Sequence, residues 1–388
     1  MPGQRDNASV VRRSGVLALY GLGTVSAMFG KTSRLFGPAA AAIIVAACSA
    51  PPGLAPASQT SASSHVTNTQ SLRASLGDRV LTTPIVMGGR LILPPLHRAP
   101  GHGYLPLPAK MPKHLLYAGD LNSGQVLLYN SKKRHPQPIG EIVDGLECPA
   151  GVAVDSANNL YVADECTNHY GGSVTVYPAG QKSPSLTITD GINQAWGVAV
   201  DSQGNVFVVN IGNSTVTGYH AGQTSPFETI PQDSFGLYSQ PVGIAVDGSD
   251  NVWITVDSNS TVYEIPAGSS QPQNAGLTQL DGPIGISFDA SGDLYVTNFA
   301  ANNAAIYAPG SQSPTATITN GMQGPGPNTV TSSGKLFQGN SGENPGSSGD
   351  IQGYPPGQNE PNSFIEIPET QGLAAAPTAL PKRKLRRP

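Results

Sequence analysis

The sequence predicts an all-β protein, a β-propeller of six four-stranded blades. The 388 residues include 46 glycines and 35 prolines, and only 12% are charged, so the chain is rich in turns and poor in helix-favouring residues. Short runs of β-branched residues also recur at a nearly fixed period, which is typical of a repeat architecture. Four short strands in each repeat indicate propeller blades.

The repeat is clearest in four segments that begin Gly-Val-Ala-Val-Asp or a close variant, at residues 151–155, 197–201, 243–247 and 285–289. A tight turn, a second strand and a third strand follow each segment. A weaker fourth strand is expected at residues 186–189, 227–230 and 315–319. Degenerate copies at residues 115–129 and 331–367 raise the number of units to six.

The repeats define the domain organisation. Residues 1–47 are expected to be an export signal, with Met28 as an alternative start, and residues 48–79 a polar, flexible tether. Residues 80–112 form a flanking segment with two predicted strands, residues 113–368 form the propeller, and residues 369–388 a disordered basic tail. The first unit lacks an inner strand, and residues 80–95, which favour strands more than the residues after Ile367, are expected to complete it.

The export signal ends in a distinctive way. An apolar run at residues 35–47 leads into Val45-Ala46-Ala47-Cys48, with small residues just before the cysteine. This resembles the lipobox of bacterial lipoproteins. The resemblance implies cleavage before Cys48, a lipid on its thiol and a membrane-anchored protein of the cell envelope. A plain secretory signal that releases the protein is the alternative.

The blades resemble known repeats. The pattern Gly-Val-Ala-Val-Asp followed by Leu160-Tyr-Val-Ala-Asp164 is similar to the NHL repeat, and Tyr295-Val-Thr-Asn298 is similar to the YVTN repeat. A more distant likeness is to gluconolactonases and streptogramin lyases. The resemblance covers residues 113–368 and implies the propeller fold, but such propellers include enzymes, binding proteins and scaffolds.

Two sets of repeated polar residues are candidate sites. The first comprises Asp155, Asp201, Asp247 and Asp289, each before a tight turn, where a carboxylate can accept backbone N–H groups. The second, after the second strands, comprises Asp164, Asn210, Asp257 and Asn298. The likeness to gluconolactonases implies a divalent-cation site for this second set, at one mouth of the channel. The favoured alternative is a turn-forming role, because a metal site usually breaks the symmetry of a repeat.

The cysteines suggest a disulfide. Cys148 precedes the first strand of its blade and Cys166 follows the second, so the hairpin between them places the two nearly opposite each other. An exported address permits a disulfide. A metal site involving nearby His169 is the alternative, but these residues alone cannot supply four zinc ligands.

Little in the sequence favours catalysis. No nucleophile motif is present, and no histidine follows His220, so none can take the role of the late-blade histidine of streptogramin lyases. Residues 111–381 contain 6 Lys and Arg against 23 Asp and Glu, a balance of −17 that disfavours nucleic acid. We therefore expect a monomeric, non-enzymatic scaffold without a cofactor that binds a protein or small molecule. A metal-dependent lactonase-like or lyase-like enzyme is the alternative function.

Overall fold

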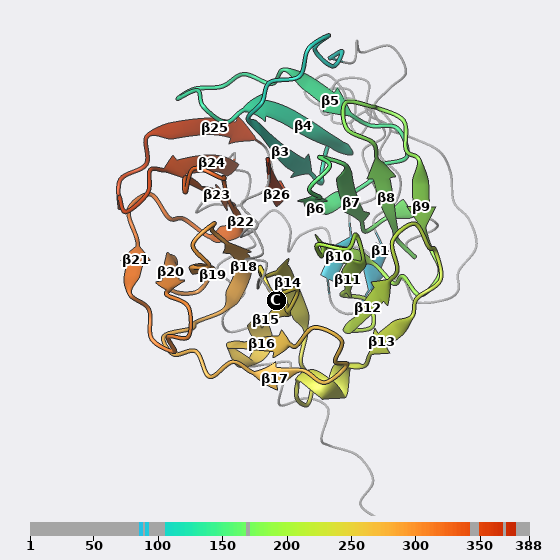
Figure 1. Cartoon of the computed structure of the whole chain (residues 1–388), viewed down its shortest axis with the longest axis vertical. Coiled ribbons are helices and arrows are strands. Elements are labelled where there is room, and N and C mark those ends of the chain that lie inside the picture. Colours follow the sequence, from blue (N-terminus) through green and yellow to red (C-terminus); the bar gives the residue numbers. More distant parts are fainter. Residues whose placement is uncertain are drawn as a thin grey trace, which may run out of the picture. The chain divides into compact units, whose positions relative to one another are not determined.

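A computed structural model describes residues 105–167, 171–341, 349–367 and 370–377, together with two short strands further upstream. All of these lie in the compact unit that begins at Ser61. The upstream strands, β1 (Ile85–Met87) and β2 (Arg90–Ile92), pair with each other in an antiparallel hairpin. The other strands, β3 to β26, form a ring of sheets (Figure 1).

The ring contains six four-stranded antiparallel sheets, which confirms the predicted propeller. Blades 2 to 5 each use four consecutive strands. Blade 2 comprises β6 (Pro149–Val154), β7 (Leu160–Asp164), β8 (Ser173–Tyr177) and β9 (Leu186–Ile188), and blade 3 comprises β10 (Ala195–Val200), β11 (Val206–Asn210), β12 (Thr215–Tyr219) and β13 (Glu228–Ile230). Blade 4 comprises β14 (Pro241–Val246), β15 (Val252–Val256), β16 (Thr261–Ile265) and β17 (Gln273–Asn274), and blade 5 comprises β18 (Pro283–Phe288), β19 (Leu294–Asn298), β20 (Asn303–Tyr307) and β21 (Ala316–Ile318). Blade 6 comprises β22 (Pro325–Val330), β23 (Leu336–Asn340), β24 (Gly349–Tyr354) and β25 (Ser363–Ile367).

Blade 1 closes the ring with a strand from the other end of the chain. It consists of β3 (Leu115–Asp120), β4 (Gln125–Asn130) and β5 (Gly140–Ile142), with β26 (Thr370–Ala376) as its inner strand. The register pairs Ala376 with Leu115 and Thr370 with Asp120. The predicted closure by residues 80–95 is therefore wrong, and the propeller extends beyond residue 368. Alanine is generally depleted in strands, but the alanines of β26 are buried in the crowded centre of the ring, where small side chains allow close packing.

Part of the predicted flanking segment lies against the outer strand of blade 1. Leu107 and Met111 pack on the apolar cluster between blades 1 and 2. The backbone N–H of Leu105 donates to Glu141 Oε1 at 2.9 Å, and Lys182 Nζ donates to the carbonyl oxygen of Leu105 at 2.8 Å. Residues 105–112 thus cover the rim of the propeller without joining a sheet.

Apolar side chains fill the space between every pair of neighbouring blades. The six buried clusters each combine residues of two adjacent blades, and the cluster between blades 6 and 1 includes Phe337, Tyr129 and Leu373. Five tyrosines add a hydrogen bond across successive junctions, because each hydroxyl donates to a carbonyl oxygen of the preceding blade or the connection that follows it. They are Tyr177, Tyr219, Tyr263, Tyr307 and Tyr354. Packing between blades therefore carries most of the core.

Candidate functional site: the channel mouth and its loops

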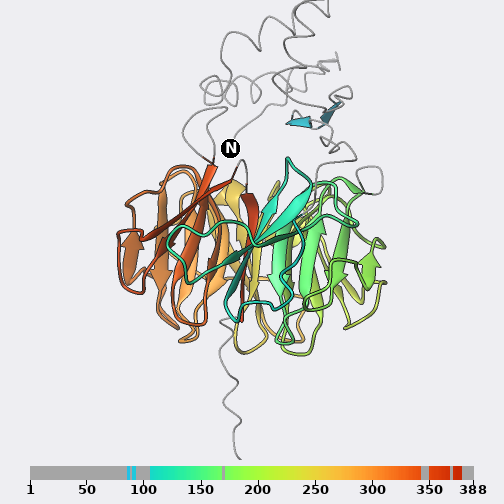
Figure 2. The same ribbon diagram turned by 90° about the horizontal axis from the view of Figure 1, so that it is seen from above.

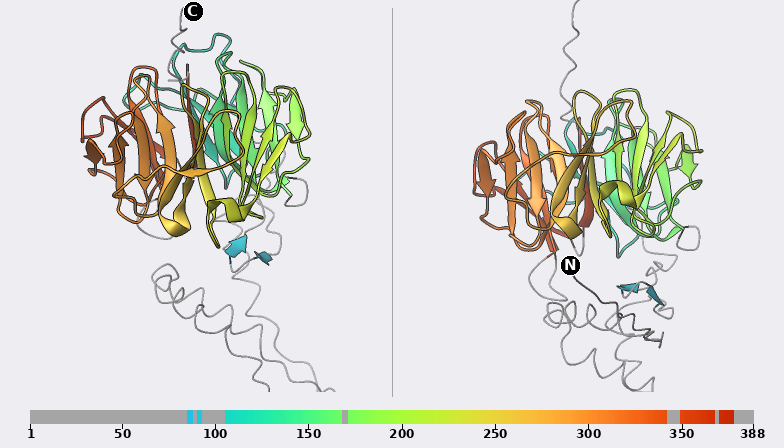
Figure 3. Two further views of the ribbon diagram at one scale, coloured as in Figure 1. Left: turned by 60° about the horizontal axis from the view of Figure 1, so that its bottom comes forward. Right: turned by 90° about the horizontal axis from the view of Figure 1, so that it is seen from below.

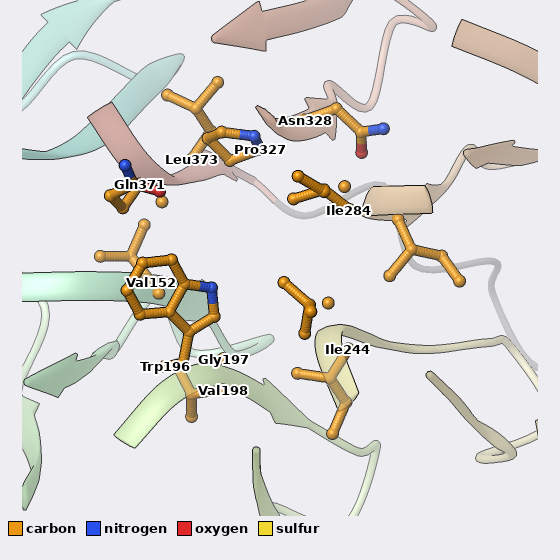
Figure 4. Close-up of a pocket in the computed structure, with 16 residues that line it drawn as sticks. Val152, Trp196, Gly197, Val198, Ile244, Ile284, Pro327, Asn328, Gln371 and Leu373 are labelled. Carbon is orange, nitrogen blue, oxygen red and sulfur yellow. The ribbon is translucent and has the colours of Figure 1, made fainter. Parts of the chain in front are cut away.

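The inner strands β6, β10, β14, β18, β22 and β26 surround a narrow central channel (Figure 4). Glycines let the strands approach closely: a methyl group on Gly243 would overlap the carbonyl oxygen of Ile284, and one on Gly372 that of Ala150. Two cavities that described residues line along the channel have volumes of about 90 and 130 Å³. Ligand pockets usually measure roughly 300 to 1,000 Å³. The channel therefore has room for a few water molecules rather than a substrate.

One wall of the channel is polar. Five blades line it with an aliphatic residue at the same position, whereas blade 6 has Asn328 there. Asn328 Nδ2 donates to Thr297 Oγ1 at 2.7 Å, and Thr297 Oγ1 donates to Gln338 Oε1 at 2.8 Å. Asn328 Oδ1 has no hydrogen-bond partner within the described chain although the residue is buried. This oxygen can accept a hydrogen bond from a water molecule in the channel.

The second set of predicted polar residues does not form a ring of open ligands. Asp164, Asn210 and Asn298 are fully buried, and each accepts the backbone N–H of the residue 17 positions before it. Asn340, which the sequence analysis did not single out, makes the same contact with Gln323. These side chains hold the connection from the preceding blade against the end of the second strand. The geometry is that of the structural alternative.

Asp257 was assigned to this set incorrectly. The residue of blade 4 that corresponds to Asp164 is Val256, the last residue of β15, which pairs with Pro241 as Asp164 pairs with Pro149. Asp257 instead begins the 3-10 helix η2 (Asp257–Asn259), where desolvation and the negative charge of Asp281 raise the pKa of its carboxyl. In the described part of the chain, no group of three or more His, Cys, Asp or Glu side chains could hold a metal ion.

The first set of aspartates has the predicted turn-capping role. Asp155 Oδ1 accepts the backbone N–H groups of Ala157 and Asn159, both at 2.8 Å, and its Oδ2 accepts from Asn159 Nδ2 at 2.7 Å. Equivalent backbone contacts recur at the other three positions, which are Asp201, Asp247 and Asp289. These carboxylates are satisfied within their own hairpins.

Cys148 and Cys166 form a disulfide, as the sequence predicted, with their Cα atoms 5.3 Å apart. It joins the start of β6 to the loop after β7, next to the hydrogen bonds of Asp164. His169 lies outside the described residues, and so does Cys48, the predicted lipid-bearing residue.

We expect the free energy of unfolding of the Cys148→Ala/Cys166→Ala double variant to be lower than that of the parent by about 2 to 4 kcal/mol, because the disulfide restricts the unfolded chain. Urea denaturation of the oxidised proteins measures this difference. A double variant as stable as the parent, or parent thiols that alkylate freely after denaturation without reductant, would contradict a stabilising bridge.

The longest connection between consecutive blades presents two apolar side chains to solvent. Residues 231–240 link β13 to β14 and contain the 3-10 helix η1 (Gln232–Phe235), at one face of the propeller (Figure 3). Within this loop Leu237 is 78% exposed and Tyr238 81% exposed. Single exposed apolar residues are common, but two adjacent large ones at this exposure are typical of an interaction surface.

A buried side chain and several hydrogen bonds fix this loop on the propeller. The Phe235 ring is fully buried in the cluster between blades 3 and 4, and its carbonyl oxygen accepts Asn259 Nδ2 at 3.1 Å and Tyr263 Oη at 2.8 Å. Gln232 and Ser239 close the loop, since each side chain donates to the other residue's carbonyl oxygen at 2.9 and 3.0 Å. Leu237 and Tyr238 are therefore displayed on a braced support.

Two further large side chains belong to the same face. Inner strands begin, and second strands end, at this face, as the pairing of Pro283 with Asn298 shows. Trp196, near the start of β10, lines the channel there (Figure 4), and Phe299, just after β19, is 45% exposed. None of these four side chains was predicted from the sequence. For Leu237 and Tyr238 a signal exists in the apolar run Phe235-Gly-Leu-Tyr238, which lies outside every predicted strand.

A family-repeat match and a solved structure with a TM-score above 0.5 both support the propeller fold. Residues 146–169 match the model of the NHL repeat. A structure described as a nidogen/laminin complex is 16% identical to this chain, with a TM-score of 0.56, and the match covers 68% of this chain and 98% of the other. A dihydro-heme d1 dehydrogenase, NirN, is 17% identical with a TM-score of 0.44, over 88% of this chain and 66% of the other. No curated protein sequence matches.

The described residues include no helix long and apolar enough to cross a membrane. Figure 2 shows the same ring from its side, with the strands of each blade running between its two faces.

Proposed function

We propose that this β-propeller, whose residues 146–169 match the NHL repeat, is a non-catalytic scaffold, exported and lipid-anchored, that binds a partner protein on the face carrying Leu237 and Tyr238. The observation that carries the proposal is the braced loop at residues 231–240. A buried anchor, Phe235, holds two exposed apolar side chains in a fixed position, and preorganisation of this kind lowers the entropy cost of binding.

The composition of this face favours a protein partner. Tyrosine and tryptophan are enriched among the residues that dominate protein–protein binding energy, and Tyr238, Trp196 and Phe299 all belong to this face. The two cavities described along the channel are smaller than usual ligand pockets, which favours binding by the loops. The lipobox at Cys48 supports the anchoring part of the proposal.

Photo-crosslinking in the native cell tests this proposal. We expect a photoreactive phenylalanine analogue at position 238 to give one discrete crosslinked species, and the added change Leu237→Ser to reduce its yield at least about tenfold, since an interface anchor contributes about 2 kcal/mol or more. The matched control places the same analogue at Phe364, which is 42% exposed on blade 6.

Mass spectrometry identifies the crosslinked protein, and purified components should then bind with the same dependence on Leu237. The proposal fails if position 238 gives no discrete product, or if the product forms equally from position 364 and survives Leu237→Ser.

A further inference from the structure

The positive charges of the propeller are concentrated at one junction. No lysine or arginine occurs between Ser183 and Gly334, so blades 3, 4 and 5 have none. Four of the described cations belong instead to blades 6 and 1: Lys132, Lys133 and Arg134 follow β4, and Lys335 precedes β23. We call these four residues the basic junction. An acidic propeller therefore has one localised site of positive charge, where the ring closes.

The two parts of the basic junction are in contact. Lys132 Nζ donates to Ser333 Oγ at 3.3 Å, which joins the loop after β4 to the first hairpin turn of blade 6. The backbone N–H of Phe364 donates to the carbonyl oxygen of Arg134 at 3.0 Å, and the ring of Phe364 stacks on His135 with centroids 6.2 Å apart. Lys132, Lys133 and Arg134 are all exposed, so their charged groups are accessible to a ligand.

Blade 6 departs from the repeat at this point. In blades 2 to 5 the residue after the inner strand is a capping aspartate, and the residue four positions later is Asn or Asp. Blade 6 has Thr331 and Lys335 at these two positions, and Thr331 Oγ1 still accepts the backbone N–H of Lys335 at 3.1 Å. The turn is thus capped without a carboxylate. Its net charge changes from negative to positive, and the fold alone does not require that change.

Lys335 is held in a partly buried position without a counter-charge. Its Nζ donates to Ser363 Oγ at 2.8 Å and lies 4.7 Å from the centre of the Phe337 ring. Desolvation, and then the positive charges of Lys132 and Arg134, lower the pKa of Lys335 to about 8. Among the described residues, no carboxylate contributes to the pKa of Lys335. A bound anion would offset the positive charges of Lys132, Arg134 and Lys335, and hydrogen bonds between ionised groups are strong.

We propose that the basic junction binds phosphate groups, through the ammonium groups of Lys132 and Lys335 with Arg134 and the hydroxyl of Ser333 around them. Phosphate suits the site because it offers several acceptor oxygens and more than one negative charge to several donors. The same end of blade 1 carries Ala376 and Pro377, after which the sequence continues into Lys382-Arg-Lys-Leu-Arg-Arg387. This site is separate from the face that carries Leu237.

The full chain should be tested with two probes that share a phosphodiester. One is soluble polyglycerol phosphate, followed by calorimetry, and the other is sedimentation with vesicles of equal parts phosphatidylglycerol and phosphatidylcholine, with pure phosphatidylcholine as the baseline. We expect binding that weakens with added salt. Binding of both probes indicates a free phosphate polymer as a ligand, whereas binding of vesicles alone indicates a lipid surface.

Restoring the repeat residue is the sharpest variant. Thr331→Asp keeps a turn-capping oxygen and every basic residue, yet its negative charge should weaken phosphate binding about tenfold. Lys335→Gln should also weaken binding about tenfold, which is the loss expected for one hydrogen bond to a charged group. Thr331→Asn, a neutral cap, and Lys182→Gln, which removes one charge from blade 2, should bind within about twofold of the parent. Binding of neither probe at low salt, or parental binding by both Thr331→Asp and Lys335→Gln, overturns the proposal.

Discussion

A chain that ends at Ile367 should fail to form the native propeller, whereas a chain that ends at Pro377 should fold like the parent. The first truncation removes β26, the inner strand of blade 1, with its pairing to β3 and the buried side chains of Leu373 and the alanines that follow. It also leaves an unpaired edge facing the channel, which propellers do not tolerate. We expect the shorter chain to lack a cooperative melting transition and to aggregate.

A point variant tests the contribution of β26 without removing the residues that follow it. Leu373→Ala removes a side chain that is only 6% exposed in the cluster between blades 6 and 1 and should reduce the free energy of unfolding by about 2 to 5 kcal/mol. Thermal melting and limited proteolysis measure both effects. A stable, cooperative propeller without residues 368–388 would show that another segment can close the ring.

Asp164→Ala should destabilise the protein more than any single loss of a turn-capping aspartate. The Asp164 carboxylate is fully buried and accepts four backbone N–H groups, those of Glu147, Cys148, Cys166 and Thr167, at 2.7 to 3.2 Å. Removing the acceptor leaves these donors buried without partners, and each such group costs roughly 1 to 3 kcal/mol. Water that enters the space recovers part of this, so we expect a loss of about 3 kcal/mol or more in urea denaturation.

Asp164→Asn is the matched comparison, because Asn210 and Asn298 already occupy this position in other blades. An amide has one acceptor oxygen and one donor nitrogen, so it can replace only part of the carboxylate's contacts. We expect a smaller loss than for Asp164→Ala, and Asp201→Ala should also cost less because that residue caps a turn at the surface. Equal stability of Asp164→Ala and the parent would show that the loop does not depend on this carboxylate.

The blades were predictable because their signals are local. Glycine, alternating valines and a capping aspartate recur within each unit, and the turn geometry that the aspartates need is set by neighbouring residues. The assignment of Asp257 departed from that regularity: the 46-residue spacing that leads from Asp164 to Asn210 leads next to Val256, the last residue of β15, and Asp257 is the polar residue that follows it and begins η2.

Ring closure and the candidate site depend on contacts that no local pattern records. Residues 370–376 are rich in alanine and favour no strand by composition, and they become one because β3 offers an unpaired edge at a crowded centre. Leu237 and Tyr238 stand out only once the burial of Phe235 shows that their loop is fixed and their side chains face outward. The basic junction likewise required knowledge of which blades are neighbours.

Four of the five tyrosine hydroxyls that bond to neighbouring carbonyl oxygens should give the molecule a spectroscopic signature, those of Tyr177, Tyr219, Tyr307 and Tyr354. Burial raises the pKa of Tyr307 to about 12, and desolvation also raises the pKa of Tyr177, Tyr219 and Tyr354. These hydroxyls should therefore stay protonated at an alkalinity that ionises an ordinary tyrosine. In an alkaline titration followed by ultraviolet absorption, a late increase in the tyrosinate signal thus marks the separation of the blades.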